Sequence, residues 1–418
     1  MQIMLQEKKI QRKNLLCRVI YDFGNSFFIV AIGAMFLAQR LIIDNKVPDI
    51  RYGASFSLAT ILVLFVSPFL GARSDKIGRR MPFLTRSTIA LITINGMIAL
   101  AALSSFPNKV RIVLGLSVIL QFFYQISLIF YNALLKDISK ETNRGTIAGI
   151  GDGLGNLGWI VALFIFLPIA NGTFALIGTA GRHQVFLPAF ILSTLFMLPM
   201  LLRFKEHKQP IIHATQNIYK KTRTGIRQLR TTQKNVGLYL LAFSLISDIV
   251  LTMTLYLAVV MDTMYKVGET TKSTVLIIFL IMGMFFGYIF GKFADKFGYK
   301  NILILTCVLL TINCIIFFSC TTPWVLYVVG ALGGIASGGY FTVTRAFMIR
   351  LSPLGEIGEY FGLYSTFQKA ASITAPLLRG GITLWLIQYP VFKYQVAGAA
   401  MTILLIVGTI LMMRVKEH

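Results

Sequence analysis

Long apolar runs alternate along the chain with short segments that carry proline, glycine, asparagine or charge. A helix needs about 20 apolar residues to cross roughly 30 Å of hydrocarbon, because each residue adds about 1.5 Å. Twelve runs reach this length, and we predict a membrane-spanning helix in each. The predicted spans are residues 18–41, 51–72, 82–104, 110–135, 147–170, 184–202, 236–262, 272–294, 300–320, 323–350, 361–386 and 391–413.

The composition supports an all-α membrane protein. Hydrophobic residues make up 56% of the chain and charged residues only 13%. A water-soluble enzyme, a disordered chain or a coiled coil could not keep so many apolar side chains away from water.

The positive charge follows the predicted topology. The net charge of +24 would indicate nucleic acid binding in a soluble protein. With a cytoplasmic N-terminus, however, 27 of the 40 Lys and Arg residues fall on the cytoplasmic side and nine on the other. We therefore expect both termini in the cytoplasm, no nucleic acid partner, and a bacterial inner (plasma) membrane as the location. The basic segment 203–235 fits a cytoplasmic linker that follows the positive-inside rule. It could in addition contact anionic lipid headgroups.

One segment occurs twice, half a chain apart. GARSDKIGRR (residues 71–80) follows the second span, and GKFADKFGYK (residues 291–300) follows the eighth. A repeat of this length predicts two similar halves. The domains we expect are a six-helix bundle at 1–202, a cytoplasmic linker at 203–235 and a second bundle at 236–418.

The charged residues of these two segments have expected roles in a gate. We expect Asp75 and Asp295 to cap or pair across their turns. Arg79 and Arg80 are expected to hold the cytoplasmic face.

This repeated pattern resembles the loop signature of the major facilitator superfamily, G-x-x-x-D-[RK]-x-G-[RK]-[RK]. Further segments are similar to the unknown-major-facilitator family, which is itself similar to the fungal vacuolar effluxer of amino acids. They are YDFGNSFF (21–28), FYNALLKDIS (130–139), GIGDGLGNLG (149–158), AFSLISDIVLT (242–252) and EYFGLYSTFQKAASITAPLL (359–378). The resemblance implies two bundles that rock about a central polar cavity and a transported solute similar to an amino acid. Lys136, Asp152, Asn156 and Ile249 depart from the family pattern, so the substrate does not transfer directly.

Ionisable residues inside spans are costly and mark functional sites. All seven glutamates lie outside the predicted spans, which leaves aspartate as the only expected buried acid. Asp248 is about 12 residues, or roughly 18 Å, into its span and therefore near the middle of the bilayer. Two interpretations stay open. Either Asp248 binds a proton or a substrate amine, or it is a structural carboxylate that a basic residue, Ser244, Ser247 or Thr252 holds in place.

Other polar residues lie closer to the cytoplasmic ends of their spans. Asp22, with Asn25 and Ser26 one turn further in, binds substrate or takes part in a gate. Opposite charges at this depth could form bonds in one transport state and break them in the other. The expected network comprises Arg86, Asp152, Arg345 and Lys369, of which Lys369 could instead meet a substrate carboxylate.

Two further features have both a functional and a structural interpretation. Tyr131 and Asn132 could hydrogen-bond a solute, although tyrosine is also common at membrane interfaces. The glycines of residues 149–158 include a G-x-G-x-x-G match, but no strand precedes it, and a smooth helix face for close packing fits better.

Motifs for other chemistry are missing from the sequence. It contains no Walker G-x-x-x-x-G-K-[ST], no C-x-x-C pair and no span with a catalytic Ser/His or Cys/His set. We expect no enzyme activity, no metal and no cofactor.

The sequence therefore predicts a monomeric secondary transporter of a small polar or zwitterionic solute, which does not hydrolyse ATP and is driven by protons or another ion. Two alternatives stay open. One is a lipid or lipid-linked flippase on the same fold, which needs a laterally open apolar cavity. The other is a transport-inactive receptor or assembly factor, which does not need a titrating acid in the middle of the membrane.

Overall fold

The computed structural model describes most of the 418-residue chain. The described residues are 2–34, 36–47, 49–104, 108–173, 175–176, 179, 181–206, 229, 233–353, 356–371, 378, 381–382, 385–386, 388–389 and 391–417. These residues form helices and connecting turns, without any strand.

The chain divides into two compact units. Unit 1 comprises Met1–Ile138 and Leu154–His213, and unit 2 comprises Ser139–Gly153 and Ala214–His418. The division falls inside helix α7 (Arg144–Ala170), so residues 144–153 of this helix pack in unit 2 and residues 154–170 pack in unit 1.

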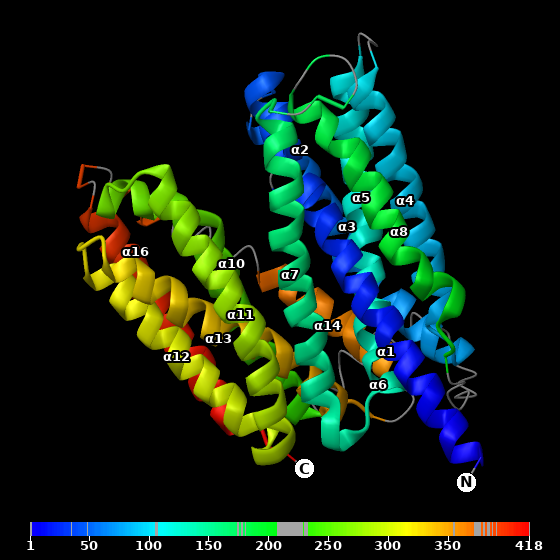
Figure 1. The fold of residues 1–418 in the computed structure, drawn as a ribbon. Helices are drawn as coiled ribbons and strands as arrows, with labels where there is room; N and C mark the ends of the chain where they lie inside the picture. Colours follow the sequence, from blue (N-terminus) through cyan, green and yellow to red (C-terminus); the bar gives the residue numbers. More distant parts are fainter. Residues whose placement is uncertain are drawn as a thin grey trace. The chain divides into compact units, whose positions relative to one another are not determined.

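Unit 1 contains five of the first six predicted spans and residues 154–170 of α7. Its helices are α1 (Gln2–Phe28), α2 (Phe36–Gln39), α3 (Asp49–Ile77), α4 (Met81–Leu103), α5 (Lys109–Ala133), α6 (Leu135–Ile138) and α8 (Phe186–Arg203). The main contacts pair α1 with α8, α3 with α5, and α4 with both α5 and α8. Figure 1 shows α1 and α8 side by side along their length.

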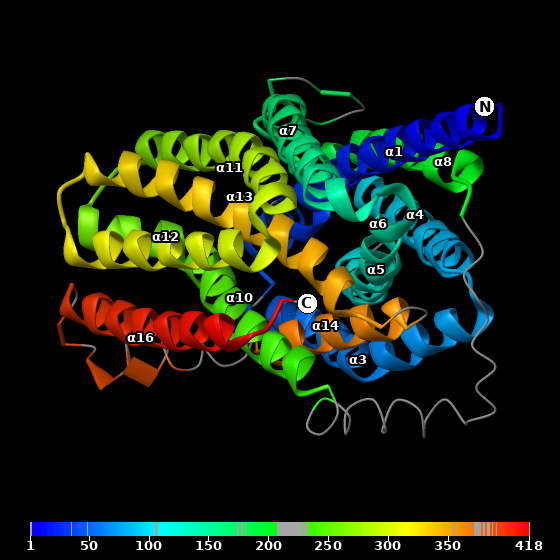
Figure 2. The same cartoon turned by 90° about the horizontal axis from the view of Figure 1, so that it is seen from below.

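Unit 2 contains the second half of the predicted spans. Its helices are α10 (Lys234–Val260), α11 (Glu269–Phe297), α12 (Tyr299–Ser319), α13 (Val325–Leu351), α14 (Ile357–Ala371) and α16 (Phe392–Arg414). Here α10 pairs with α16, α11 with α13, and α12 with both α13 and α16. Figure 2 shows α11, α13, α12 and α16 as neighbouring helices.

The helix pairs of the two units correspond one to one. In each, the first helix packs on the sixth, the second on the fourth, and the third on the fourth and sixth. The repeat in the sequence is therefore accompanied by a repeat in packing.

The predicted fold class is confirmed. Eleven helices within the described residues are long and apolar enough to cross a membrane. The remaining predicted span, 361–386, begins as α14 and then runs partly outside the described residues.

One expectation about buried acids is wrong. Helix α14 begins at Ile357 rather than near residue 361, so Glu359 lies within its first turn. Glu359 is only 3% exposed. Aspartate is therefore not the only buried acid. The expectation fails because Glu359 interrupts the apolar run in the sequence, although the start of α14 on which it lies is still buried.

The last helix of unit 1 is followed by a carboxylate that caps another helix. Glu206 accepts hydrogen bonds from the backbone N–H groups of Arg80 and Met81, where α4 begins, and the bond to Met81 is 3.0 Å long. Negative charge is favourable at this end of a helix. Burial raises the pKa of the Glu206 carboxyl, while the two N–H donors act in the opposite direction.

The last helix of unit 2 ends in the same way. Glu417 accepts hydrogen bonds from the N–H groups of Tyr299 (3.0 Å) and Lys300 (2.9 Å), where α12 begins. In both units an asparagine also bonds the backbone of the residue before the glutamate. Asn14 bonds both the N–H and the C=O of Lys205, and Asn235 bonds both groups of Lys416, at 2.7–3.0 Å.

Candidate functional site

The signature segment of unit 1 forms a buried ion pair. Arg80 donates to Asp75 at 3.1 Å, and the two residues are 2% and 3% exposed. Asp75 thus pairs across the turn that Gly78 makes with a φ of 68°. Arg79 and Arg86, in contrast, are exposed residues of unit 1.

The second copy of the signature caps a helix instead. Asp295 accepts hydrogen bonds from the N–H groups of Gly145 and Thr146, both at 2.7 Å, and from the Thr146 hydroxyl at 2.6 Å. Tyr299 donates a fourth bond to the same carboxylate at 2.8 Å. Since α7 begins at Arg144, Asp295 neutralises the positive end of that helix.

Glycines let α7 approach α11 closely. A Cβ added to Gly145 would lie 2.3 Å from the carbonyl oxygen of Gly291, and one added to Gly149 would lie 2.5 Å from that of Gly287. In unit 1 a Cβ on Gly158 would lie 2.9 Å from the Cβ of Ser26. The interpretation of this glycine run as a packing face is confirmed.

A second link joins α7 to α13 within unit 2. Arg345 of α13 forms an ion pair with Asp152 of α7. Thr342, one turn before Arg345, donates its hydroxyl to the same carboxylate at 2.5 Å. The side chains of Arg345 and Asp152 are 17% and 22% exposed, so water reaches the pair and can replace either partner.

Unit 1 has its own charged cluster at α1 and α5. Tyr131 donates its hydroxyl to the Asp22 carboxylate. Arg18 donates to the carbonyl oxygen of Tyr131 at 2.7 Å, and its guanidinium lies 3.9 Å from the centre of the tyrosine ring. The ring of Tyr21 stacks on Tyr131 with centroids 5.1 Å apart. Arg18 is only 2% exposed, so the positive charge is largely removed from water.

Nearby amide side chains keep unused hydrogen-bonding capacity. The Oδ1 of Asn132 and the Oε1 of Gln125 are buried without a hydrogen-bond partner among the described residues. Gln125 is 4% exposed and Asn25 is 6% exposed. Buried amides of this kind are able to bind a polar solute, because a lone carbonyl oxygen in an apolar interior costs free energy until it is satisfied.

Asp248 lies near the middle of the 27-residue helix α10 and is 2% exposed. The Ser244 hydroxyl donates to the carbonyl oxygen of Leu241 at 2.8 Å. The Ser247 hydroxyl pairs with Tyr340 of α13 at 3.1 Å. Both hydroxyls thus take part in hydrogen bonds to other groups.

An aromatic layer surrounds this part of unit 2. Phe243 of α10 stacks on Tyr364 of α14, with ring centroids 4.0 Å apart. The hydroxyl of Tyr340 donates to the carbonyl oxygen of Phe243 at 3.1 Å, and that of Tyr239 donates to the carbonyl oxygen of Thr344 at 2.7 Å. The layer ties α10, α13 and α14 together beside Asp248. Lys369 lies on α14, the helix that packs against α10.

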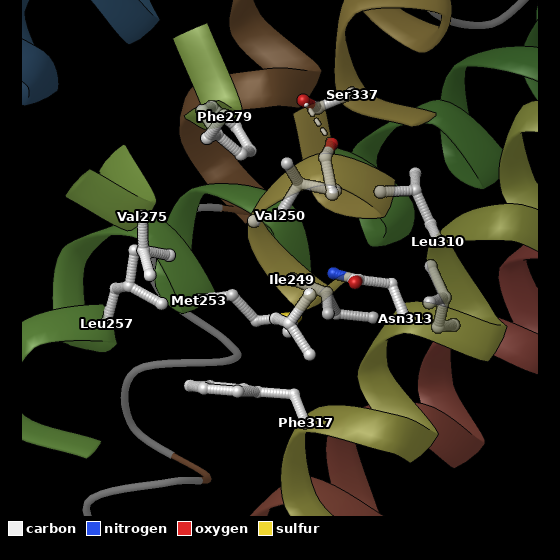
Figure 3. A pocket seen from close by; sticks show the side chains of 14 residues that line it. Ile249, Val250, Met253, Leu257, Val275, Phe279, Leu310, Asn313, Phe317 and Ser337 are labelled. Carbon is white, nitrogen blue, oxygen red and sulfur yellow. Dashed lines mark hydrogen bonds between the residues drawn. The ribbon is translucent and has the colours of Figure 1, made fainter. Parts of the chain in front are cut away.

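One cavity of about 50 Å³ lies directly after Asp248 along α10 (Figure 3). Its wall is apolar, with Ile249, Met253 and Phe279 among the lining residues, and Asn313 points into it. The Oδ1 of Asn313 has no hydrogen-bond partner among the described residues, and the side chain is 7% exposed. The cavity is large enough for a few water molecules or a small branched group.

Several of these residues carry no signal of function in the sequence. Arg18 belongs to the basic N-terminal segment, and Gln125 and Asn313 are uncharged residues inside apolar runs. The pentapeptide RFKEH at 203–207 recurs as RVKEH at 414–418, which is a signal for the two capping glutamates.

Comparison with known proteins identifies the family. Residues 15–266 and 238–418 match the sequence profile of the Major Facilitator Superfamily. The uncharacterized MFS-type transporter YxiO of Bacillus subtilis is 25% identical over 426 residues, which covers 96% of this chain and 94% of that protein. Autophagy-related protein 22-1 of Aspergillus fumigatus is 23% identical over 278 residues, which covers 59% of this chain and 45% of that protein.

The fold also has close counterparts among solved structures. The proton:xylose symporter XylE bound to 6-bromo-6-deoxy-D-glucose superposes with a TM-score of 0.74 at 15% identity, over 98% of this chain and 97% of that one. The resemblance stated from the sequence signature is thus confirmed. The chain is a multi-pass membrane protein that belongs to the major facilitator superfamily, whose members are transporters rather than enzymes.

Proposed function

We propose that this transporter carries a small polar or zwitterionic organic solute, with amino acids as the first candidates, and couples the movement to protons or another ion. The burial of Asp248 near the middle of α10 carries the proposal. A carboxylate at this depth is costly, and such groups are retained where they bind a proton, an ion or a cationic part of the substrate.

A zwitterion needs groups of both signs. We assign the amine or the proton to Asp248 and the carboxylate to Lys369, because their helices α10 and α14 pack together in unit 2. Asp22, Asn25, Tyr131 and Asn132 stay proposed binding residues of unit 1. The cluster of Asp22 with Tyr131 and the unused capacity of Asn132 support this assignment.

Alternating access requires contacts that form in one state and break in the other. We propose this role for the Asp152–Arg345 pair with Thr342 and for the cap that Asp295 places on α7. The buried Asp75–Arg80 pair is the proposed counterpart in unit 1. We also propose Arg79 and Arg86 as members of the gate, only because they lie close to the cytoplasmic ends of their predicted spans.

The distribution of charge supports a placement in the membrane. We propose that both termini face the cytoplasm of a bacterium, with the protein in the inner membrane and acting as a monomer. The cytoplasmic side would then carry most of the Lys and Arg residues.

Transport by the purified protein tests the substrate class. Proteoliposomes loaded with one amino acid are given the same amino acid in labelled form, because exchange needs no coupling ion. We expect saturable exchange of at least one amino acid in the panel. If none exchanges while labelled phospholipid crosses the bilayer, the chain is a flippase. If neither moves, a transport-inactive receptor is the better description.

A further inference from the structure

The middle of α1 and the end of α8 enclose a groove that the transport mechanism does not use. Its volume is about 820 Å³, and it lies within unit 1 between residues 10–20 and 199–205. The end of α8 at Arg203 coincides with the end of a membrane span, so this end of the groove lies at the level of the lipid headgroups.

Three cations line the groove: Lys13, Arg203 and Lys205. All three are exposed residues, and none forms an ion pair within the described part of the chain. The nearest acid along the chain, Glu206, is bonded to the N–H groups of Arg80 and Met81. Among the described residues, no carboxylate is therefore ion-paired with these three cations.

Apolar side chains also line the groove, and two of them are exposed. Leu16 is 59% exposed and Leu202 is 76% exposed, and Phe204 also lines the groove. Cations beside exposed leucines at the headgroup level fit a ligand that has an anionic head and a hydrocarbon chain.

The groove has a fixed wall. Asn14 is 1% exposed and bonds both backbone groups of Lys205, at 3.0 Å and 2.8 Å, which holds the segment after α8 against α1. Lys13 of α1 and Lys205 after α8 are thus kept near each other, although both side chains are exposed.

From these features we propose that the groove binds one anionic phospholipid. Its phosphodiester contacts Lys13, Arg203 and Lys205, and an acyl chain lies along Leu16 and Leu202. The linker at 203–235 carries nine basic residues and no acidic residue except Glu206, so it has the wrong sign to neutralise the groove. Basic pockets between membrane helices bind anionic headgroups in this way.

Native mass spectrometry of the purified full chain tests the proposal. Phosphatidylglycerol, phosphatidylcholine and the soluble headgroup glycerophosphoglycerol are titrated separately. We expect one saturable phosphatidylglycerol per chain, at least 10-fold weaker phosphatidylcholine binding and at least 10-fold weaker headgroup binding. Equal binding of the two lipids would overturn the selectivity for an anion, and equal binding of the soluble headgroup would overturn the lipid assignment.

A matched pair of variants locates the site. The triple change Lys13→Gln, Arg203→Gln and Lys205→Gln should weaken phosphatidylglycerol binding at least 10-fold. The control Lys292→Gln, Lys296→Gln and Lys300→Gln removes three cations from unit 2 and should leave the affinity within 2-fold. If both variants lose binding equally, or neither does, the groove is not the site. If the triple variant does not give monodisperse protein, Lys13→Gln alone should weaken binding about 3-fold, and unchanged binding would contradict the proposal.

Discussion

Glu206 and Glu417 perform the same task in the two halves of the chain. Each follows the last helix of its half, and each carboxylate accepts hydrogen bonds from two backbone N–H groups where the third helix of that half begins. The segment after the last helix of each half is thus bonded to the first helix, through Asn14 or Asn235, and to the start of the third helix, through the glutamate.

Removing either capping carboxylate should destabilise its unit. Glu206→Ala and Glu417→Ala each leave two N–H groups at a helix start without their acceptor, at a cost of about 1 kcal/mol. We expect a lower thermal midpoint for both variants in detergent. Glu141→Gln is the control, since that side chain is 68% exposed and 4.0 Å from Arg350. A midpoint that falls as far in the control as in the two variants would contradict the capping role.

The contribution of Glu206 should depend on pH with a definite sign. Burial raises the pKa of its carboxyl in the folded protein above the value of about 4.3 expected in the unfolded chain. The folded state therefore binds the proton more tightly, so this contribution to stability is fully present below about pH 4 and is lost as pH rises through the raised pKa. The thermal midpoint of the native protein minus that of Glu206→Gln should narrow between pH 4 and pH 7. A difference that widens with pH would show that the N–H donors outweigh burial.

Close packing between α7 and α11 should not tolerate a methyl group. Gly145→Ala and Gly291→Ala each place a Cβ within 2.3 Å of a carbonyl oxygen of the facing helix. Relief of such a clash costs roughly 1–3 kcal/mol. We expect lower stability and lower transport, measured by thermal unfolding and by exchange. Gly115→Ala is the matched control, because a Cβ at Gly115 meets nothing within 4 Å. Equal effects at all three glycines would refute the packing argument.

The pair of Asp152 and Arg345 permits a charge-exchange test. Asp152→Asn or Arg345→Gln removes one partner and should lower the exchange rate at least 10-fold, since the proposed gate between α7 and α13 then loses its ion pair. The double variant Asp152→Arg with Arg345→Asp restores opposite charges and should recover part of the rate. Full activity in the single variants would mean that the pair does not act as a gate.

Much of the fold could be predicted from sequence because hydropathy and the repeat act through simple rules. Apolar runs of sufficient length become spans, and the aspartates of residues 71–80 and 291–300 do bond across turns or helix starts. The two copies nevertheless behave differently. Asp75 pairs with Arg80, whereas Asp295 caps α7, and nothing in the linear pattern distinguishes these partners.

The partners of the buried polar residues depend on how the helices are rotated and how they cross. Neither can be predicted from a single sequence. Arg18 is buried because it lies over Tyr131, although it belongs to a basic segment. Asn313 is one polar residue in an apolar run, and only its neighbours reveal that it faces a cavity. Asp152 and Arg345 are separated by 193 positions in the sequence. At this separation the pattern of charges does not indicate which acid pairs with which base.

Proton-driven uptake by the native chain and by Asp248→Asn tests the central claim most directly. Both proteins are reconstituted in equal amounts, and accumulation of an exchanged amino acid is measured with and without an inward proton gradient. Asp44→Asn, whose side chain is 21% exposed, is the control for a lost carboxylate elsewhere. We expect the gradient to drive accumulation by the native and control proteins, while Asp248→Asn retains only exchange or no transport. Gradient-driven accumulation by Asp248→Asn at the native rate would contradict it.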